Sequence, residues 1–181
     1  MKVLETERLL LRPWTKDDAE ALYEYAKHPD IGPHAGWKPH ESVEESEIIL
    51  ETILLPVSAW AIVFKETGEI IGNIALEPDR IRPDILSKEL GYGLKHEFWG
   101  KGIITEASKE VLRYAFEELQ LEIVAIHTSE VNKRSQRVIE KCGFKYEGLI
   151  RMATRTYTGE ARNSLVYSIS KGEWMKKNSK E

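Results

Sequence analysis

The sequence predicts a single domain of the mixed α/β class, in which helices flank a central sheet. First, short segments in which apolar and polar residues alternate, as in β-strands, are interspersed with segments that carry apolar residues at helical spacing. Second, two pairs of strand segments are joined by short glycine-containing turns, which indicates hairpins. Third, 181 residues suit one domain that buries about two thirds of its unfolded surface. We expect this domain to span residues 1–175, followed by a polar, frayed tail at 176–181.

Composition argues against several classes of protein. The formal net charge of −4 is unusual for a general nucleic-acid binder, because such binding depends on clustered Lys and Arg. The single cysteine, Cys142, excludes an internal disulfide and a cysteine-based metal cluster, suits a reducing compartment, and is expected in the core. The sequence shows no signal-peptide pattern and no apolar run long enough to span a membrane. We therefore expect a cytoplasmic protein that binds no nucleic acid, membrane or metal.

The N-terminal part is predicted to form one strand and two helices. Residues 9–11 are apolar, and the following proline ends the strand. Thr15 with Asp18, and Ser42 with Glu45, have the spacing of a capping box, and each pair precedes apolar residues at helical spacing. A loop therefore connects the two helices.

This loop, residues 28–41, contains three prolines and two glycines. Loops of this length inside a compact domain are commonly functional. We expect it to form a wall of the substrate site, with His34, Trp37 and His40 as contacts.

The middle of the chain is predicted to be a run of three strands. Residues 60–64 and 70–76 flank a glycine-containing turn and form a hairpin. Residues 86–94 form the third strand, in which Gly91 and Gly93 lie on the same face. Paired glycines inside a strand indicate a bulge or the close approach of another backbone.

The C-terminal part continues the alternation of helix and strand. A helix is predicted over 103–119, and residues 123–128 are apolar and β-branched, as in a strand covered on both faces. The next helix, 132–142, ends at a glycine that suits a left-handed cap. Residues 144–150 and 165–169 form the closing strands.

The segment 97–107 carries the clearest functional signal. Gly100 and Gly102 flank Lys101 where a strand ends and a helix begins. The first turn of a helix has unpaired backbone N–H groups, and glycines let an anion approach them closely. The segment therefore predicts a site for a pyrophosphate.

Three kinds of anion-binding loop have this character, and spacing separates them. A Walker A loop needs four residues between its first glycine and a Gly-Lys-Ser/Thr ending, which the sequence lacks. A dinucleotide-binding loop needs a small residue at Thr105 and an acidic residue that ends the next strand, whereas Glu122 opens it.

The third kind fits. With Asn132 and Ser135 about thirty residues on, and Gly143 closing the helix after them, segment 97–107 resembles the acetyl-CoA loop of the GNAT superfamily of N-acetyltransferases. The residues Phe-Trp-Gly-Lys-Gly at 98–102, followed by Thr-Glu-Ala at 105–107, are most similar to the ribosomal-protein N-terminal acetyltransferase (RimJ/RimL-like) subgroup. The resemblance extends from residue 7 to about residue 168, most of the chain.

The resemblance implies a fold and a cosubstrate. The fold is a mixed α+β domain with a mostly antiparallel, twisted central sheet of about seven strands and about four flanking helices. Strand 86–94 is expected to splay from its neighbour and pair with the pantetheine arm of acetyl-CoA. One position departs from the pattern: the loop usually opens with Arg or Gln, and here it opens with Glu97. We expect Glu97 to point away, and backbone amides with Lys95, Lys101 or Arg134 to hold the anion.

The cofactor contacts implied by the loop and the resemblance form one set. It comprises Leu94, Lys95, His96, Trp99, Gly100, Lys101, Gly102, Ile103, Ile104, Thr105, Asn132, Arg134 and Ser135.

Amine acetylation needs a base, an oxyanion donor and an acid for the departing thiolate. Ser135 lies on an otherwise apolar helix face near the helix N-terminus, a position that suits the acid that protonates the thiolate. The alternative is a serine that only hydrogen-bonds to the first turn of its own helix. Asn132 is a helix N-cap that by resemblance also contacts the acetyl end. Glu89, on the glycine face of its strand, is the first candidate for the base; Glu130 and Glu147 are weaker. A backbone N–H between residues 94 and 96 is the expected oxyanion donor.

The sequence therefore predicts an enzyme that transfers acetyl directly from acetyl-CoA to an amine, as a monomer or homodimer. By subgroup resemblance the acceptor is the α-amine of a protein or peptide. A small amine such as a polyamine, aminoglycoside or amino acid is the alternative, and Tyr157 in the last hairpin is a further candidate contact. A non-catalytic acyl-CoA-binding module is another class. We expect His127, in its apolar strand, to be structural.

Overall fold

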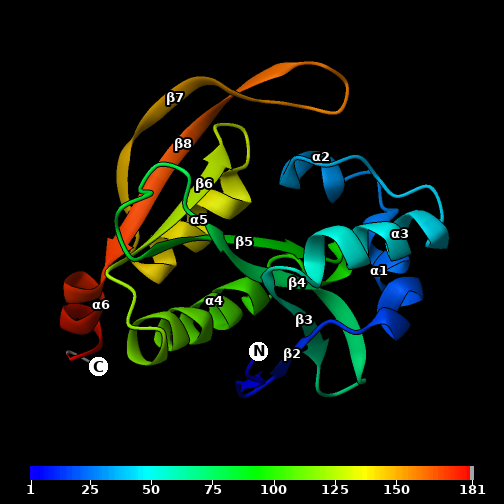
Figure 1. Cartoon of the computed structure of the whole chain (residues 1–181), viewed down its shortest axis with the longest axis horizontal. Coiled ribbons are helices and arrows are strands. Elements are labelled where there is room, and N and C mark those ends of the chain that lie inside the picture. Colours follow the sequence, from blue (N-terminus) through cyan, green and yellow to red (C-terminus); the bar gives the residue numbers. More distant parts are fainter. Residues whose placement is uncertain (180–181) are drawn as a thin grey trace.

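The computed structural model describes residues 1–179, and the side chains of residues 34 and 35 lie outside that description. Eight strands form one sheet in the order β1-β2-β3-β4-β5-β6-β8-β7, with helices on both faces (Figure 1). The strands are β1 (Leu4–Glu5), β2 (Leu9–Pro13), β3 (Ser58–Phe64), β4 (Glu69–Pro78), β5 (Ser87–Leu94), β6 (Ile123–Ser129), β7 (Lys145–Arg155) and β8 (Ala161–Ser170).

Within residues 1–179, six α-helices surround the sheet: α1 (Ala19–Ala26), α2 (Gly32–Ala35), α3 (Val43–Ile49), α4 (Ile103–Arg113), α5 (Lys133–Cys142) and α6 (Lys171–Asn178). Short 3-10 turns, η1 (Lys16–Asp18) and η3 (His96–Phe98), precede α1 and α4. Wider π turns, η2 (Leu50–Leu54) and η4 (Tyr114–Glu118), extend α3 and α4. None of the described helices is long and apolar enough to cross a bilayer.

The predicted fold class is confirmed, with additions. Seven of the strands match the predicted ones, and the eighth is the two-residue β1 beside β2. All neighbours pair antiparallel except β5 and β6, which are parallel. The added helices are α2, which lies inside the predicted loop 28–41, and α6, which the sequence did not predict.

Two apolar cores lie on the two faces of the sheet. On one face α4 and α5 cover a core that includes Leu90, Leu94 and Val111. On the other face α1 and α3 cover a core that includes Leu22 and Leu50. Alternate residues of β5 therefore face different layers of the molecule.

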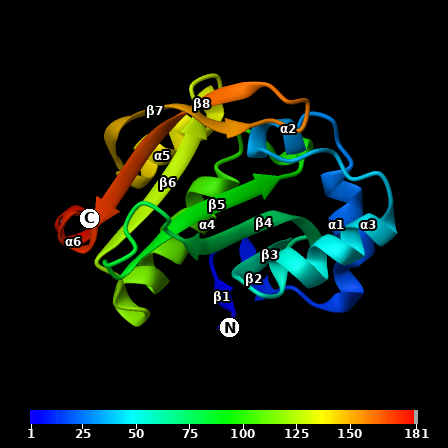
Figure 2. The ribbon, with the colours of Figure 1, turned by 45° about the horizontal axis from the view of Figure 1, so that its top comes forward.

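The sheet opens between β5 and β6. Their ladder pairs only Ser87–Glu89 with Ile123–Ala125. Beyond these pairs the two strands fan apart towards their C-terminal ends (Figure 2). The expected splay of strand 86–94 is present, and it exposes one edge of β5 from residue 90 onward.

Candidate active site

A cavity of about 810 Å³ occupies the opening between β5 and β6. Its walls come from both strands, from η3 and the glycine loop, from the first turn of α4, from α5, and from Ile31 and Trp37 beside α2. Of the predicted cofactor contacts, eleven line this cavity: Leu94, His96, Trp99, Gly100, Gly102, Ile103, Ile104, Thr105, Asn132, Arg134 and Ser135.

The glycine loop presents unused amides to the cavity. Gly100 and Gly102 have φ of +76° and +77°, in the left-handed region that favours glycine. The carbonyl of Gly102 accepts the N–H of Glu106 and so starts α4. Among the hydrogen bonds of residues 1–179, none uses a backbone N–H between residues 100 and 105 as donor.

A carboxylate inside α4 fixes this loop to the N-terminal segment. Glu106 accepts the hydroxyl of Thr6 at 2.6 Å and the backbone N–H of Arg8 at 3.0 Å. The guanidinium of Arg8 binds the same carboxylate and also donates to the carbonyl of Lys101 at 3.1 Å. Burial alone would raise the pKa of Glu106, but these hydrogen bonds outweigh it and the pKa is lowered.

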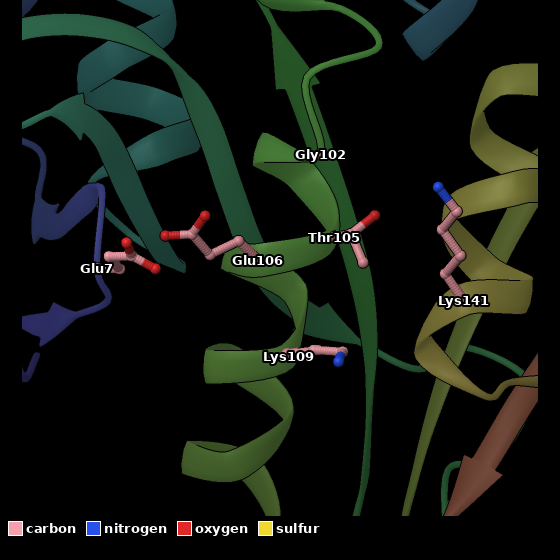
Figure 3. Close-up of a pocket in the computed structure, with 6 residues that line it drawn as sticks. All are labelled: Glu7, Gly102, Thr105, Glu106, Lys109 and Lys141. Carbon is pink, nitrogen blue, oxygen red and sulfur yellow. The ribbon is translucent and has the colours of Figure 1, made fainter.

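Basic residues of α5 face the start of α4. Arg134, Arg137 and Lys141 all line the cavity, and the guanidinium of Arg134 lies 4.6 Å from the centre of the Trp99 ring. Figure 3 shows Lys141 reaching from α5 towards the first turn of α4, beside Thr105. The sequence analysis missed Arg137 and Lys141, although their spacing from Arg134 predicts one helix face.

Two predicted cofactor contacts lie outside this cavity. The ammonium of Lys95 pairs with Glu69 of β4, and its backbone N–H donates to the carbonyl of Ile71 at 2.7 Å. Lys101 is exposed and lies over the Phe98 ring. Glu97 is exposed and does not line the cavity. The basic residues that face the cavity are therefore those of α5, and not Lys95 or Lys101.

At the inner end of the cavity two hydroxyl groups meet. Ser135, 8% exposed, has its Oγ 2.9 Å from the phenolic oxygen of Tyr92. Asn132 caps α5, because its Oδ1 accepts the N–H of Ser135 at 3.1 Å. Burial raises the pKa of Tyr92, so the phenol keeps its proton at neutral pH. The sequence analysis assigned no role to Tyr92.

The backbone N–H groups in the range predicted for the oxyanion donor point in different directions. The N–H of Lys95 is directed at β4, where Ile71 accepts it. Because successive residues of a strand direct their amides to opposite edges, the N–H of Leu94 points into the opening beside β6. Within the predicted range 94–96, Leu94 is therefore the residue whose amide faces the cavity from the strand.

Acidic groups lie on the face of β5 that is opposite to the face carrying Tyr92. Glu89 lines the cavity and lies directly across from Glu77 of β4. His127 of β6 has its Nδ1 3.7 Å from Oε1 of Glu89. Burial is the main cause that raises the pKa of Glu89, and the negative charges of Glu77 and Asp79 add to it.

The weaker base candidates have other partners. Glu147 binds Arg82 and accepts the hydroxyl of Ser168 at 2.7 Å, which together lower its pKa despite partial burial. Glu130 accepts the side-chain amide of Asn163 at 2.8 Å. Neither lines the cavity.

Some of the predicted substrate contacts line the cavity and others do not. Trp37 lines the cavity. His40 does not: it is 8% exposed, with its Nδ1 2.7 Å from the hydroxyl of Ser46, and burial lowers its pKa. The His40 ring packs on Trp37, with 5.2 Å between ring centroids, so His40 lies behind a lining residue and outside the cavity lining. Tyr157 is exposed at the tip of the β7–β8 hairpin and is not part of the lining, and the side chain of His34 lies outside the described residues.

Comparison with known proteins adds to this geometry. A family model described as an acetyltransferase (GNAT) domain matches residues 8–145. The chain is 29% identical over 174 residues to the uncharacterized N-acetyltransferase YoaA of Bacillus subtilis, covering 93% of this chain and 97% of YoaA. It is 45% identical over 109 residues to YdaF of Bacillus subtilis, provisionally named a ribosomal N-acetyltransferase, covering 59% of this chain and 57% of YdaF.

A solved structure shares the fold. It is spermidine N-acetyltransferase from Vibrio cholerae in complex with CoA and spermine, which matches with a TM-score of 0.78 and 20% identity. The match covers 94% of this chain and 99% of that chain.

Proposed function

The chain belongs to the GNAT family of acetyltransferases, and on this premise we propose that it acetylates the N-terminal α-amine of a protein or peptide, using acetyl-CoA. We place it in the ribosomal-protein N-terminal acetyltransferase (RimJ/RimL-like) subgroup. The observation that carries the proposal is the cavity between β5 and β6, which has unused amides and basic groups at one end and Glu89 at the other.

The cofactor end is suited to a diphosphate. The amides of residues 100–105 donate to the phosphate oxygens, and Arg134, Arg137 and Lys141 supply the positive charge that Glu97 does not. A smaller pocket beside them, of about 360 Å³, is lined by two lysines, Lys109 and Lys141, and by two carboxylates, Glu7 and Glu106 (Figure 3). The exposed edge of β5 after Glu89 then accepts the amide-containing arm of acetyl-CoA.

The reacting end supplies each group that acyl transfer requires. Glu89 takes a proton from the acceptor amine, directly or through one water, as the amine attacks the thioester carbonyl. The N–H of Leu94 binds the oxyanion of the tetrahedral intermediate. Ser135 gives its proton to the departing thiolate and receives another from Tyr92. Tyr92 regains its proton from solvent, and Glu89 returns to solvent the proton that it took from the amine. A neutral amine and acetyl-CoA therefore give the acetylated amine and free coenzyme A, with no net release of a proton.

The acceptor is assigned from the subgroup resemblance and the partial match to YdaF. An α-amine has a pKa near 8, so a substantial fraction is neutral at pH 7 and a weak base suffices. The acidic pair of Glu77 and Glu89 also favours a small cationic amine, which is the second candidate.

Two assays test the proposal. Acetyl-CoA, but not NAD or ATP, is expected to raise the melting temperature. Thiol release is then measured with peptides that have a free α-amine and with the same peptides blocked at the N-terminus. Release that requires the free α-amine supports the proposal. Release with polyamines, aminoglycosides or amino acids alone identifies a small-molecule enzyme. Binding of acetyl-CoA without release from any acceptor identifies a binding module.

A further inference from the structure

His127 is the residue beside Glu89 to which the proposed function gives no part. Its side chain is 23% exposed, that of Glu89 is 27% exposed, and both line the same cavity. The sequence predicted a structural histidine in an apolar strand. The parallel register of β5 and β6 changes that interpretation, because it sets Glu89 opposite Ala125. His127, two residues further along β6, therefore lies on the same face, where the strands separate.

The ring is oriented so that one nitrogen faces the carboxylate. Nδ1 lies 3.7 Å from Oε1 of Glu89, whereas Nε2 is buried and has no hydrogen-bond partner among the described residues. A proton on Nε2 would be a buried, unsatisfied donor, so the tautomer with its proton on Nδ1 costs less. In that tautomer the N–H points towards Glu89. The separation is longer than a hydrogen bond, and such contacts commonly tighten when substrate binds.

The charged groups around Glu89 are mostly repulsive. Glu77 faces it from β4, and Asp79 and the exposed Arg80 follow β4. The guanidinium of Arg82 is already bound to Asp79 and Glu147. His127 is the donor that faces Glu89 from β6, on the side away from Glu77.

We propose that His127 is a positioning residue of the transfer reaction, whose Nδ1–H aims the Glu89 carboxylate at the acceptor amine and favours its ionised form. The inference rests on the proposed role of Glu89 as the base. The histidine donates a hydrogen bond and exchanges no proton with the substrate. Its removal therefore acts through the ionisation of Glu89.

Two substitutions separate this role from packing. His127→Phe keeps a ring and removes the donor, and because Nε2 has no described partner, it is expected to leave the fold intact. His127→Asn keeps an N–H in nearly the position of Nδ1. The control is Tyr146→Phe, which removes the hydroxyl of an exposed ring of β7 that packs on Tyr167 and does not line the cavity.

The first readout is the pH profile of kcat/KM. Glu89 must be ionised to accept a proton, so the rate falls as pH drops through its pKa. Loss of the donor raises that pKa, and we expect the acid limb of His127→Phe to move up by about one pH unit, about a tenfold loss on the limb. The kcat/KM values of His127→Asn and Tyr146→Phe are expected to stay within about twofold of the wild type.

The second readout needs no turnover. The carboxyl carbon of Glu89, assigned with Glu89→Gln, is titrated by NMR in the wild type and in each variant. An upward shift of the Glu89 midpoint in His127→Phe alone supports the proposal, even if no acceptor is ever found. An unchanged midpoint in His127→Phe, or equal shifts in His127→Phe and His127→Asn, would overturn it. If His127→Phe does not fold, the comparison of His127→Asn with the wild type decides: a shift as large as one unit means that the retained N–H does not serve Glu89.

Discussion

In the proposed mechanism, the proton for the leaving thiolate comes from a pair of residues at the inner end of the cavity, Ser135 and Tyr92. A serine hydroxyl alone is a poor acid, because it is only very weakly acidic near neutral pH. Tyr92 lies 2.9 Å away, and burial raises its pKa, so the phenol is a protonated partner at every pH of interest. Ser135 is the third residue of α5, so the positive end of this helix stabilises the negative charge that develops as the proton is transferred.

Substitution of the two hydroxyl groups tests this arrangement. We expect Ser135→Ala to lower kcat by about 10²-fold, because the group next to the thiolate is lost. Tyr92→Phe is expected to lower kcat by only about tenfold, since Ser135 can still be supplied by water. The double variant should resemble Ser135→Ala, because the two residues act in series. Steady-state kinetics at saturating acetyl-CoA measures these effects. A larger loss in Tyr92→Phe than in Ser135→Ala would make Tyr92 the acid.

At the scale of elements, the junction of η3 and α4 combines two requirements. The chain must turn sharply with φ near +76° at Gly100 and +77° at Gly102, and it must leave the first amides of α4 uncovered. Glycine meets both requirements, and the clamp of Glu106 on Arg8 holds the turn in place. The glycine turn was predictable from sequence because Gly100, Gly102 and the start of α4 lie within a few residues of one another. The clamp was not, because it joins residues that are 98 positions apart.

Gly100→Ala isolates the role of this junction in binding. An alanine at positive φ costs about 1 kcal/mol, which lowers the melting temperature by about 3 °C in a domain of this size. A Cβ there would meet no atom within 4 Å in the protein, so any further effect comes from the ligand. We expect a loss of acetyl-CoA affinity of about tenfold or more, measured by calorimetry.

The matched control is Gly68→Ala, in the turn between β3 and β4. Gly68 has φ of +72° and equally open surroundings, and it lies outside the cavity. The Gly68→Ala variant is expected to lose about as much stability as Gly100→Ala and to keep the wild-type affinity for acetyl-CoA. Equal affinities of the two variants would contradict a diphosphate site at Gly100.

At the scale of the molecule, the limit of sequence prediction is the register between distant segments. The capping residue Asn132 and the glycine face of β5 were predictable, because helix and strand periodicity act locally. The contacts of Glu89 with His127 and of Tyr92 with Ser135 were not, since each depends on how two strands or a strand and a helix are aligned. The same holds for α2, where a short helix forms in a loop rich in proline and glycine.

The wall formed by α2 depends on one such contact. The β7–β8 hairpin arches towards α2, and Arg162 of β8 donates to the carbonyl of Pro33 at 3.0 Å (Figure 1). The carbonyl of Gly32 in turn accepts the N–H of Trp37 at 2.9 Å, so α2 and Trp37 are expected to move together. Arg162 therefore connects the last hairpin to the wall of the cavity that Trp37 lines.

This connection predicts a selective kinetic defect. Arg162→Gln removes a hydrogen bond worth about 1 kcal/mol, so the KM of the acceptor is expected to rise about fivefold. The affinity for acetyl-CoA should not change, because the described polar partners of Arg162 are Pro33 and Glu160, outside the glycine loop and α5. Arg155→Gln is the control, since Arg155 donates only to Gly159 inside the same hairpin among the described contacts. A parallel loss of acetyl-CoA affinity in Arg162→Gln, or an equal rise of acceptor KM in Arg155→Gln, would show that the hairpin acts on the whole fold and not on the acceptor wall.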